Sequence, residues 1–276
     1  MEKKAACVIG WPIKHSRSPL IHGYWIKQHG LDAEYRREEV APEAFADFIR
    51  NISSRGYLGA NITIPHKEAA LELSEPDDCA RAVGAANTLW LDGGRLRSTN
   101  TDVEGFTANL DDAVPGWAGR AGEAVVLGAG GSARAVIHGL IERGIGRINV
   151  VNRSMERAQS LRQRFGAAVH PAEWAALPGL LGRCGLLVNT TSLGMAGQPP
   201  LVIDLSPLPA HSIVTDLVYS PLTTSLLTAA RARGLAVADG LGMLLHQAVR
   251  GFELWFGVRP RVTAELRTLV ETDLLK

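Results

Sequence analysis

The sequence predicts a two-domain α/β protein, with a mixed α/β sheet in one domain and a doubly wound parallel sheet in the other. The length of 276 residues suits one large or two modest domains, and an apolar fraction of 46% supports a sizeable core. Short apolar runs alternate with helical patterns along the chain. Near the middle, an apolar run ends abruptly in glycines and an alanine-rich helical pattern follows, as in a strand, a tight turn and a helix N-terminus.

Charge and cysteine content exclude several classes of protein. The net charge is +1 with acids and bases interspersed, so neither nucleic acid nor an anionic membrane is an expected partner. The N-terminal apolar run is too short for a signal peptide, and no stretch approaches the ~18 to 20 apolar residues of a membrane span. The 3 cysteines are far apart and show no zinc-ligand spacing with the 8 histidines. We therefore expect a cytoplasmic protein without a disulfide framework or a bound metal.

The first part of the chain predicts a small mixed sheet of its own. Strands are expected over residues 5–9, 35–40 and 59–65 and, as a hairpin around 92–94, over 85–91 and 95–98. Helices are expected over 18–29 and 42–54, and a short helix opens at 66–67. Ser18 and Pro19 predict a helix start in which Ser18 is the N-cap and Pro19 the first helical residue. A helix beginning at 101–105 leads away from this unit.

The second part of the chain predicts the doubly wound parallel sheet. Residues 114–122 are rich in Gly and Pro and precede its first strand. Strands that alternate with helical patterns are expected over residues 124–127, 147–151, 186–189, 213–217 and 236–239. The last two helices, expected over 241–256 and 262–275, have bulky apolar faces that could pack on either unit.

The glycine-rich turn indicates a Rossmann-type nucleotide site. Its residues are Gly128, Ala129, Gly130, Gly131, Ser132 and Ala133. The Gly-x-Gly-x-x-Ala spacing gives a first glycine for the tight turn and a second where the backbone can approach a pyrophosphate. The third small residue lets the helix pack on the strand. The free N–H groups of the helix N-terminus would then bind the phosphates.

The end of the next strand favours NADP over NAD. An NAD site usually has an Asp or Glu here to bind the ribose 2′-hydroxyl. This chain has Asn152, Arg153 and Ser154 instead, with Arg157 about one helical turn further on. Guanidinium groups make charge-assisted bonds to phosphate oxygens, which suits a 2′-phosphate. Alternatively, these residues form only a solvent-exposed, basic helix start and bind no phosphate, although cations are mildly unfavourable at a helix N-terminus.

Polar side chains follow most strands of the first unit. They are Ser16, Ser18, Asn61, Thr63, Lys67, Asn87, Thr88, Asn100, Thr101 and Asp102. Open α/β sheets bind ligands at the carboxyl ends of their strands. Each residue alone has an ordinary structural explanation, such as a strand position for Thr63. Together they offer hydroxyl and amide groups for a polyhydroxylated acid, and one Lys and one Asp for proton transfer.

The sequence resembles the shikimate dehydrogenase family along nearly its full length. The matching motifs of the first unit are Gly10-x-Pro12, His15-Ser16-x-Ser18-Pro19-x-x-His22, Gly59-x-Asn61-Ile62-Thr63-x-Pro65-x-Lys67, Gly84-Ala85-x-Asn87-Thr88 and Asn100-Thr101-Asp102-x-x-Gly105. Those that follow the glycine turn are Asn152-Arg153-Ser154, Asn189-Thr190-Thr191-Ser192-x-Gly194-Met195, Asp216-x-x-Tyr219-x-Pro221 and Gly240-x-Gly242-Met243-Leu244-x-x-Gln247. One departure is Gly23, where the family often has Asn.

The resemblance implies NADPH-dependent, reversible reduction of 3-dehydroshikimate to shikimate, a step of chorismate and aromatic amino acid biosynthesis. Lys67 and Asp102 would form the catalytic pair: the ammonium meets the charge that develops on the carbonyl oxygen, and the carboxylate orients the pair. Which of the two donates the proton stays open. Substrate-binding residues would be Ser16 and Ser18 at the carboxylate, and Asn61, Thr63, Asn87, Tyr219 and Gln247 around the ring and its hydroxyls.

The resemblance also implies where the chain changes domain. Residues 1–104 with 242–276 would form the substrate-binding domain, and residues 105–241 the NADP-binding domain. Cofactor-binding residues beyond the glycine turn and the Asn-Arg-Ser segment would be Thr190, Ser192, Gly240 and Met243, with Met243 beside the nicotinamide. His15, His22 and His66 lie near the motifs, and we interpret them as structural or rim residues. The partner is then a small molecule, and the chain a monomer or a homodimer.

Two alternatives remain. A quinate or dual quinate/shikimate dehydrogenase would discriminate its substrates near Ser16, Ser18 and Tyr219, because quinate has one more hydroxyl at the carboxylate-bearing carbon. A non-catalytic module that senses NADP or a metabolite could have the same fold, since a fold alone does not give a function. Retention of both Lys67 and Asp102 argues against the second alternative.

Overall fold

The computed structural model describes residues 3–276, which fold into two compact units. The first unit consists of the chain up to Thr101 together with Leu245–Lys276, and the second of Asp102–Leu244. Each unit has a six-stranded sheet of its own. The chain passes between the units within two helices, α5 (Thr101–Ala113) and α11 (Gly240–Phe256).

The sheet of the first unit is mixed, as predicted. Its strands are β1 (Lys4–Gly10), β2 (Ala33–Glu39), β3 (Tyr57–Ile62), β4 (Glu75–Pro76), β5 (Thr88–Asp92) and β6 (Arg95–Thr99). They follow the order β2-β1-β3-β5-β6-β4. Strand β1 is parallel to β2 and β3, whereas β5 is antiparallel to β3 and β6. The predicted hairpin is therefore present.

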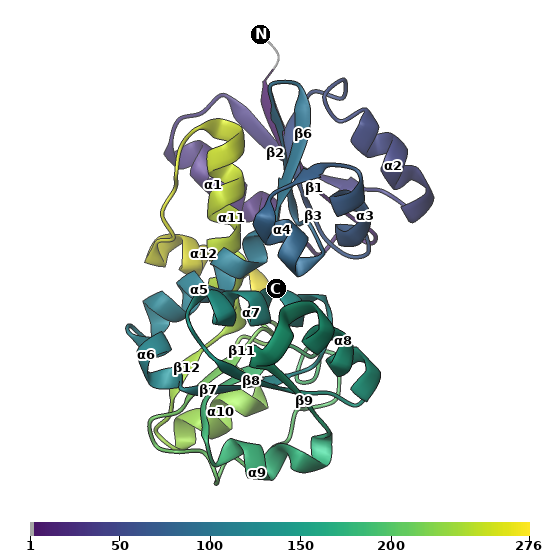
Figure 1. The fold of residues 1–276 in the computed structure, drawn as a ribbon. Coiled ribbons are helices and arrows are strands. Elements are labelled where there is room, and N and C mark those ends of the chain that lie inside the picture. The colour runs from purple at the N-terminus through teal and green to yellow at the C-terminus, as the bar shows by residue number, and fades with distance from the viewer. Residues whose placement is uncertain (1–2) are drawn as a thin grey trace. The chain divides into compact units, whose positions relative to one another are not determined.

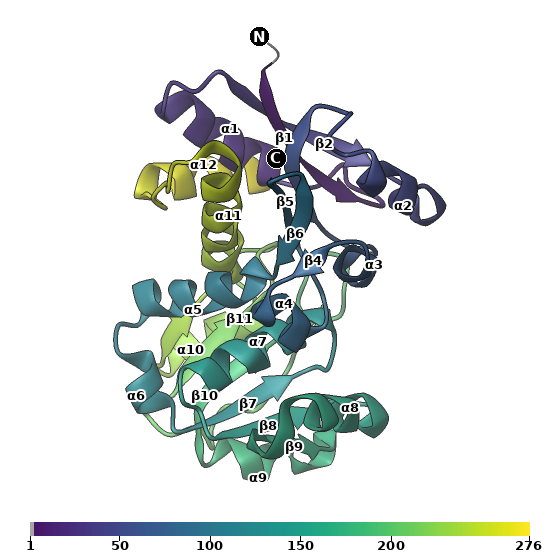
Figure 2. The ribbon, with the colours of Figure 1, turned by 45° about the horizontal axis from the view of Figure 1, so that its top comes forward.

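Helices cover both faces of this sheet. They are α1 (Ser18–Gln28), α2 (Pro42–Arg50), α3 (Lys67–Glu72), α4 (Asp78–Val83), the C-terminal part of α11, and α12 (Ala264–Leu274). In Figures 1 and 2, α1 and α11 lie on one side of the sheet and α2 and α3 on the other. The indole N–H of Trp255 in α11 donates to the Leu89 carbonyl at 2.8 Å. A Cβ on Gly59 would lie 2.3 Å from that indole nitrogen, so glycine there lets α11 pack on the sheet.

The sheet of the second unit is fully parallel and doubly wound. Its strands are β7 (Glu123–Leu127), β8 (Arg147–Val151), β9 (Val169–Ala172), β10 (Cys184–Asn189), β11 (Ile213–Asp216) and β12 (Ala236–Ala238), in the order β12-β11-β10-β7-β8-β9. The strand order reverses between β7 and β10. In open α/β sheets, ligands bind at such a point, beyond the carboxyl ends of the strands.

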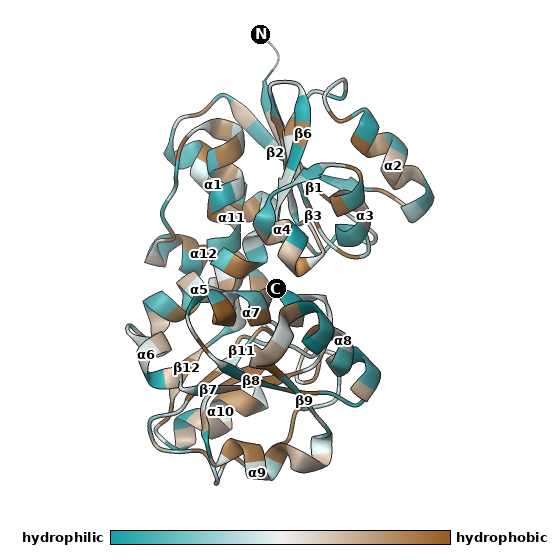
Figure 3. Cartoon of the chain, in the orientation of Figure 1, coloured by the Kyte–Doolittle hydropathy of each residue, from teal (hydrophilic) through white to brown (hydrophobic). Residues whose placement is uncertain are grey.

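Two hydrophobic layers enclose this parallel sheet. The other helices of the unit are α6 (Trp117–Ala121), α7 (Gly131–Glu142), α8 (Met155–Phe165), α9 (Leu177–Leu181) and α10 (Ser225–Ala232). Val126 of β7 packs with Val136 of α7, whereas the adjacent Val125 packs with Leu226 of α10. Neighbouring residues of one strand point to opposite faces, so each face has its own core. Figure 3 shows that α8 is largely hydrophilic along its length.

The structure corrects the prediction for Ser18. Helix α1 begins at Ser18, and Arg17 occupies the cap position without a side-chain hydrogen bond. The backbone N–H of Ser18 instead donates to Oγ of Ser16, at 3.3 Å. Ser16 therefore satisfies the N–H of the first helical residue, whereas an N-cap side chain usually accepts that of the second or third. Helix α2 also ends sooner than predicted, at Arg50.

Several short elements are absent from the prediction, among them β4, α4, α6 and β9. The Gly- and Pro-rich stretch 114–122 contains α6, whose Trp117 is fully buried and donates its indole N–H to Asp111 at 2.9 Å. Strand β9 contains Pro171 and pairs only with β8, at the sheet edge. A proline is tolerated there because its missing N–H breaks no ladder bond. Across residues 3–276, no helix combines the length and apolar character that crossing a membrane requires.

Candidate active site

The backbone around Lys67 is held firmly. Lys67 opens α3, and its carbonyl accepts the N–H of Ala86 at 2.9 Å. The preceding His66 is buried, stacks on Phe45 with ring centroids 4.2 Å apart, and has Nε2 2.7 Å from the Val40 carbonyl. Burial lowers the pKa of His66 below its usual value, so this imidazole is neutral near pH 7. Lys67, with a half-buried side chain, is therefore the cation of this turn.

Asn61 and Asn87 lie in one buried hydrogen-bond network. The amide nitrogen of Asn61 donates to the Asn87 carbonyl at 3.3 Å and to Oγ1 of Thr88 at 3.1 Å. The Thr88 hydroxyl donates to Oδ1 of Asn87, at 3.1 Å. Both N–H groups of the Asn61 amide are thus committed within the protein, which fixes the amide plane.

This network extends to the residue that precedes Asp102. Oδ1 of Asn87 accepts the backbone N–H of Thr101 at 2.7 Å and its hydroxyl at 3.1 Å. Thr101 begins α5, and Asp102, a half-buried residue, follows in the first turn. Ala86 bonds to the Lys67 carbonyl, and the next residue, Asn87, bonds to Thr101. Two consecutive residues therefore fix the backbone at Lys67 and directly before Asp102.

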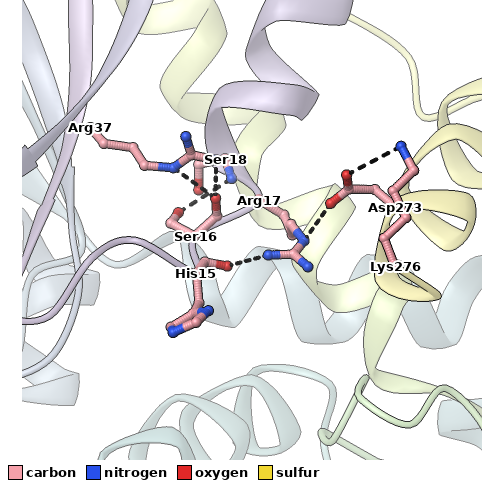
Figure 4. A network of polar contacts seen from close by, with 7 residues as sticks. All are labelled: His15, Ser16, Arg17, Ser18, Arg37, Asp273 and Lys276. Carbon is pink, nitrogen blue, oxygen red and sulfur yellow. Dashed lines mark hydrogen bonds and ion pairs between the residues drawn. The ribbon is translucent and has the colours of Figure 1, made fainter.

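The two predicted carboxylate-binding serines lie together at the start of α1 (Figure 4). Arg37 donates from Nε and Nη2 to the Ser16 carbonyl, at 3.1 and 2.9 Å. Arg17 donates to the His15 carbonyl at 2.9 Å, and its Nε lies 2.7 Å from Oδ2 of Asp273 in α12. Two guanidiniums therefore fix the backbone that presents Ser16 and Ser18, an arrangement that sequence reading did not detect.

His22, another member of the serine motif, is enclosed by aromatic rings. Its side chain is fully buried and stacks on Tyr35, with ring centroids 4.1 Å apart. Trp25 and Phe252 lie at 5.7 and 5.9 Å between centroids. Burial lowers the pKa of His22 to about 3, so the ring is neutral at physiological pH. This environment is consistent with the prediction that His22 has a structural role.

His22 is expected to make the protein sensitive to acid. Its pKa is 6.5 in the unfolded chain and about 3 in the folded one, so below pH 6.5 the unfolded state binds a proton that the folded state does not. The free energy of unfolding then falls as pH drops, by roughly 3 kcal/mol between pH 6.5 and pH 4. Denaturant unfolding at several pH values should show a smaller loss in His22→Phe and an unchanged loss in His15→Gln, an exposed control. An equal loss in His22→Phe would contradict this account.

In the second unit, the first glycine of the turn is required by the structure. Gly128 has φ +101°, which L side chains rarely adopt. A Cβ on Gly128 would also lie 2.8 Å from Oγ1 of Thr190. That hydroxyl donates to the Leu127 carbonyl at 2.7 Å, which ties the loop after β10 to the end of β7. Thr190 thus lies at the point where the strand order reverses.

The rest of the turn leaves room at the N-terminus of α7. Gly130 is the N-cap residue, and a Cβ there would meet no atom of the described residues within 4 Å apart from its chain neighbours. Gly130, Gly131 and Ser132 are exposed, whereas Ala133 is fully buried against the sheet. The free N–H groups of this twelve-residue helix are accessible to an anion.

Arg153 and Arg157 are exposed at the start of α8. Neither guanidinium has a hydrogen bond or ion pair among residues 3–276. Between them, Ser154 is the N-cap residue of α8, and its hydroxyl makes no cap bond. Asn152 donates to the Ser154 carbonyl at 2.9 Å, which orders this corner. The corner therefore presents two cations and a hydroxyl that no other group among residues 3–276 uses.

A buried carboxylate joins the loops that follow β10 and β11. Asp216 accepts the side-chain N–H of Asn189 at 2.8 Å, the backbone N–H of Val218 at 3.1 Å and the hydroxyl of Thr224 at 2.7 Å. Burial raises the pKa of Asp216 above its usual value, and these hydrogen bonds oppose the rise. The network fixes the loop that contains the half-buried Tyr219.

The remaining predicted residues lie along or beside α11. Gly240 begins the helix, and a Cβ there would lie 2.3 Å from the Leu217 carbonyl oxygen, so the close approach requires glycine. Met243 packs against the core of the second unit, and Gln247 is a half-buried residue of the first unit. Thr63 is half-buried after β3, and Ser192 is exposed after β10. Among residues 3–276, no group of three or more His, Cys, Asp or Glu could hold a metal ion.

Three family models match the chain. The shikimate dehydrogenase substrate binding domain matches residues 8–89, the shikimate/quinate 5-dehydrogenase model 118–195, and the shikimate 5′-dehydrogenase C-terminal domain 240–264. A Nitrobacter winogradskyi protein named shikimate dehydrogenase (NADP(+)) is 66% identical over 272 residues, which span 99% of this chain and 97% of that protein. The chain belongs to the shikimate dehydrogenase family. The resemblance read from the sequence is thereby confirmed.

Solved structures of the family have the same fold. Quinate dehydrogenase from Corynebacterium glutamicum in complex with NAD has a TM-score of 0.89 at 30% identity, covering 98% of this chain and 99% of that one. Shikimate 5-dehydrogenase from Thermus thermophilus in complex with NADP(H) and shikimate has a TM-score of 0.82 at 33% identity, covering 99% and 98%. Both confirm the predicted α/β fold with its Rossmann-type sheet.

Proposed function

We propose that this chain is an NADP-dependent shikimate dehydrogenase, an oxidoreductase that interconverts 3-dehydroshikimate and shikimate and so serves chorismate and aromatic amino acid biosynthesis. The observation that supports this most strongly is the 66% identity, over 99% of the chain, to a relative of that name. Most of the proposed substrate-binding residues belong to the first unit, whereas Tyr219 and the proposed cofactor-binding residues belong to the second. The boundaries of the two functional domains are proposed near residues 104 and 242.

The proposed cofactor fits the residues of the second unit. The N–H groups at the start of α7 can bind a pyrophosphate, since Gly128 makes the turn and Gly130 leaves the approach open. Arg153 and Arg157 are exposed and make no ion pair among the described residues, so both can bind a 2′-phosphate together with Ser154. Further contacts to NADP are assigned to Ala129, Gly131, Ser132, Ala133, Asn152, Thr190, Ser192, Gly240 and Met243.

The proposed chemistry assigns distinct roles to Lys67 and Asp102. When bound, NADPH supplies the hydride that reduces the substrate carbonyl. Lys67 places an ammonium toward the oxygen on which negative charge develops, and Asp102 orients that ammonium. The proton that completes the reduction comes from this pair. No metal is needed, since an ammonium can polarise the carbonyl.

The substrate is proposed to bind through hydroxyl and amide groups. Ser16 and Ser18 hold the carboxylate, and the ring with its hydroxyls is assigned to Asn61, Thr63, Asn87, Tyr219 and Gln247. Asn61 has both N–H groups committed within the protein, so it can offer the substrate only an oxygen lone pair. Hydrogen bonding to ring hydroxyls as a donor is therefore left to the other side chains.

Ser18→Ala is expected to weaken substrate binding without slowing the chemical step. A hydrogen bond to a carboxylate is worth about 1.5 to 3 kcal/mol, so KM for shikimate should rise by roughly 10- to 150-fold while kcat changes little. Ser16→Ala should behave similarly. Steady-state kinetics with NADP+ held saturating measure the effect, and Ser53→Ala, at an exposed serine of the same unit, is the matched control. A collapsed kcat with an unchanged KM would contradict a role in carboxylate binding.

Quinate is the second candidate substrate. The similarity to a quinate dehydrogenase crystallised with NAD favours it, at a TM-score of 0.89. Arg153 and Arg157 favour NADP and therefore the first candidate. Turnover of shikimate with NADP+ by the purified protein tests the proposal, and cofactor binding without turnover would instead indicate a sensing module.

A further inference from the structure

We propose that Arg37 is a positioning residue for the substrate carboxylate, because it fixes the backbone of Ser16 and places a positive charge beside it. The inference rests on the proposed function, which assigns Ser16 and Ser18 to the carboxylate. Arg37 lies on β2, an edge strand of the first sheet, and belongs to none of the motifs that the sequence shares with the family.

Ser16 is held at its backbone and keeps one proton to donate. Nε and Nη2 of Arg37 both donate to the Ser16 carbonyl, at 3.1 and 2.9 Å (Figure 4). The N–H of Ser16 donates to the Ile13 carbonyl at 3.0 Å, and its Oγ accepts the N–H of Ser18 at 3.3 Å. The Ser16 hydroxyl proton makes no bond among residues 3–276, so it can be donated to an anion.

The first residues of α1 offer no free backbone donor to a carboxylate. The N–H groups at a helix N-terminus often bind anions. In α1, however, Ser18 donates to Ser16, Pro19 has no N–H, and Leu20 donates to the Arg17 carbonyl at 3.0 Å. Binding of a carboxylate here therefore depends on hydroxyl groups and on the charge of nearby side chains.

Arg37 supplies this charge, whereas the charge of Arg17 is paired. Nε of Arg17 lies 2.7 Å from Oδ2 of Asp273, and a carboxylate at that distance offsets the field of the guanidinium. Arg37 makes no ion pair among residues 3–276, and its only partner there is the Ser16 carbonyl. The uncompensated positive charge that contacts this segment is therefore that of Arg37.

The alternation of side chains along β2 supplies a matched control for Arg37. Tyr35, on the same face of the strand, donates to Oδ1 of Asn61 at 2.6 Å, so this face points toward proposed substrate-binding residues. Arg36 points to the opposite face, where it pairs with Glu34 and lies 5.9 Å from the ring centroid of Tyr57. Both arginines are exposed, so they differ chiefly in what they contact.

Arg37→Gln removes the charge at an exposed side chain, so the fold should survive. KM for shikimate should rise by roughly 2- to 10-fold, the range for a hydrogen bond or charge at an exposed site. The values of kcat and of KM for NADP+ should stay within about twofold of the wild type, because Arg37 acts on substrate binding and not on the chemical step. Arg36→Gln should match the wild type in all three values. An unchanged KM for shikimate in Arg37→Gln, or an equal rise in Arg36→Gln, would overturn the inference.

The salt dependence of KM for shikimate tests the role of the charge. Added salt should raise KM in the wild type and in Arg36→Gln, because exposed charges are screened, and should raise it less in Arg37→Gln. Arg37→Lys keeps a positive charge and should retain the salt dependence of the wild type. An equal salt dependence in the wild type and in Arg37→Gln would contradict an electrostatic role.

A double-mutant comparison shows whether Arg37 acts through Ser16. The rise in KM for Arg37→Gln with Ser16→Ala should be smaller than the product of the single rises, because the second change removes an interaction already weakened. Independent, multiplicative losses would overturn the inference. A wild type that binds shikimate but does not turn it over contradicts the proposed function instead, and the same variants are then compared by their dissociation constants for shikimate.

Discussion

Lys67→Met is expected to lower kcat by a factor of roughly 10² to 10⁴, the contribution of a positioned acid–base group, with a smaller effect on KM. Methionine keeps an unbranched stem and removes the ammonium. The backbone of this turn is fixed by its own bonds, from Ala86 to the Lys67 carbonyl and from His66 to that of Thr63, so the fold should survive. His66 cannot substitute for the lost cation, since burial lowers its pKa below the usual value.

Two comparisons make this result specific. Lys27→Met, at an exposed lysine in the last turn of α1, is the matched control and should retain wild-type kcat. Asp102→Asn should also lower kcat, and the double variant should be much less than multiplicatively worse, because the two residues act as a unit. Near-wild-type kcat in Lys67→Met, with folding and NADP+ binding verified, would assign the proton donor to another residue, with His15 or Tyr219 next to test.

Arg153→Ala is expected to raise KM for NADP+ by roughly 10- to 150-fold, because a charge-assisted bond to phosphate is worth about 1.5 to 3 kcal/mol. KM for NAD+ should change by less than about twofold, since NAD+ has no 2′-phosphate to bind these guanidiniums. The double variant with Arg157→Ala should lose more of the preference for NADP+ over NAD+. Both side chains are exposed and make no ion pair among residues 3–276, so neither change should reduce stability.

Arg120→Ala, at an exposed arginine of the same unit, is the matched control for these cofactor variants. Increased salt should weaken NADP+ binding by the wild type more than by the double variant, because exposed charge pairs are screened. An equal rise in KM for NADP+ and NAD+ would instead mean that Arg153 supports the fold of this corner and not the 2′-phosphate.

Local sequence predicted those parts of the site that depend on backbone conformation. The glycine turn is an example: Gly128 adopts a φ of +101° that its position after a strand predicts, and Ala133 is buried as the motif requires. The Asn152–Ser154 segment lies at the end of β8, where a buried apolar strand was expected to finish. Such features involve residues close together in the chain.

Contacts between distant residues could not be predicted in the same way. Tyr35 and Asn61 are separated by 26 residues, and nothing in β2 marks one tyrosine as a partner of the site. Arg17 and Asp273 form an ion pair between the loop after β1 and the last helix, and predicting it requires the helix packing to be known. Ser18 was predicted as the N-cap but is the first helical residue, with Arg17 at the cap position, because a helix boundary depends on the conformation of the preceding turn.

The most direct test of the central claim is a matrix of kcat/KM values for shikimate and quinate, each with NADP+ and NAD+. The account predicts the highest value for shikimate with NADP+, a lower value when either component is exchanged, and loss of the NADP+ preference in Arg153→Ala with Arg157→Ala. A highest value for quinate with NAD+ would contradict it, as would a wild type that prefers NAD+ for both substrates.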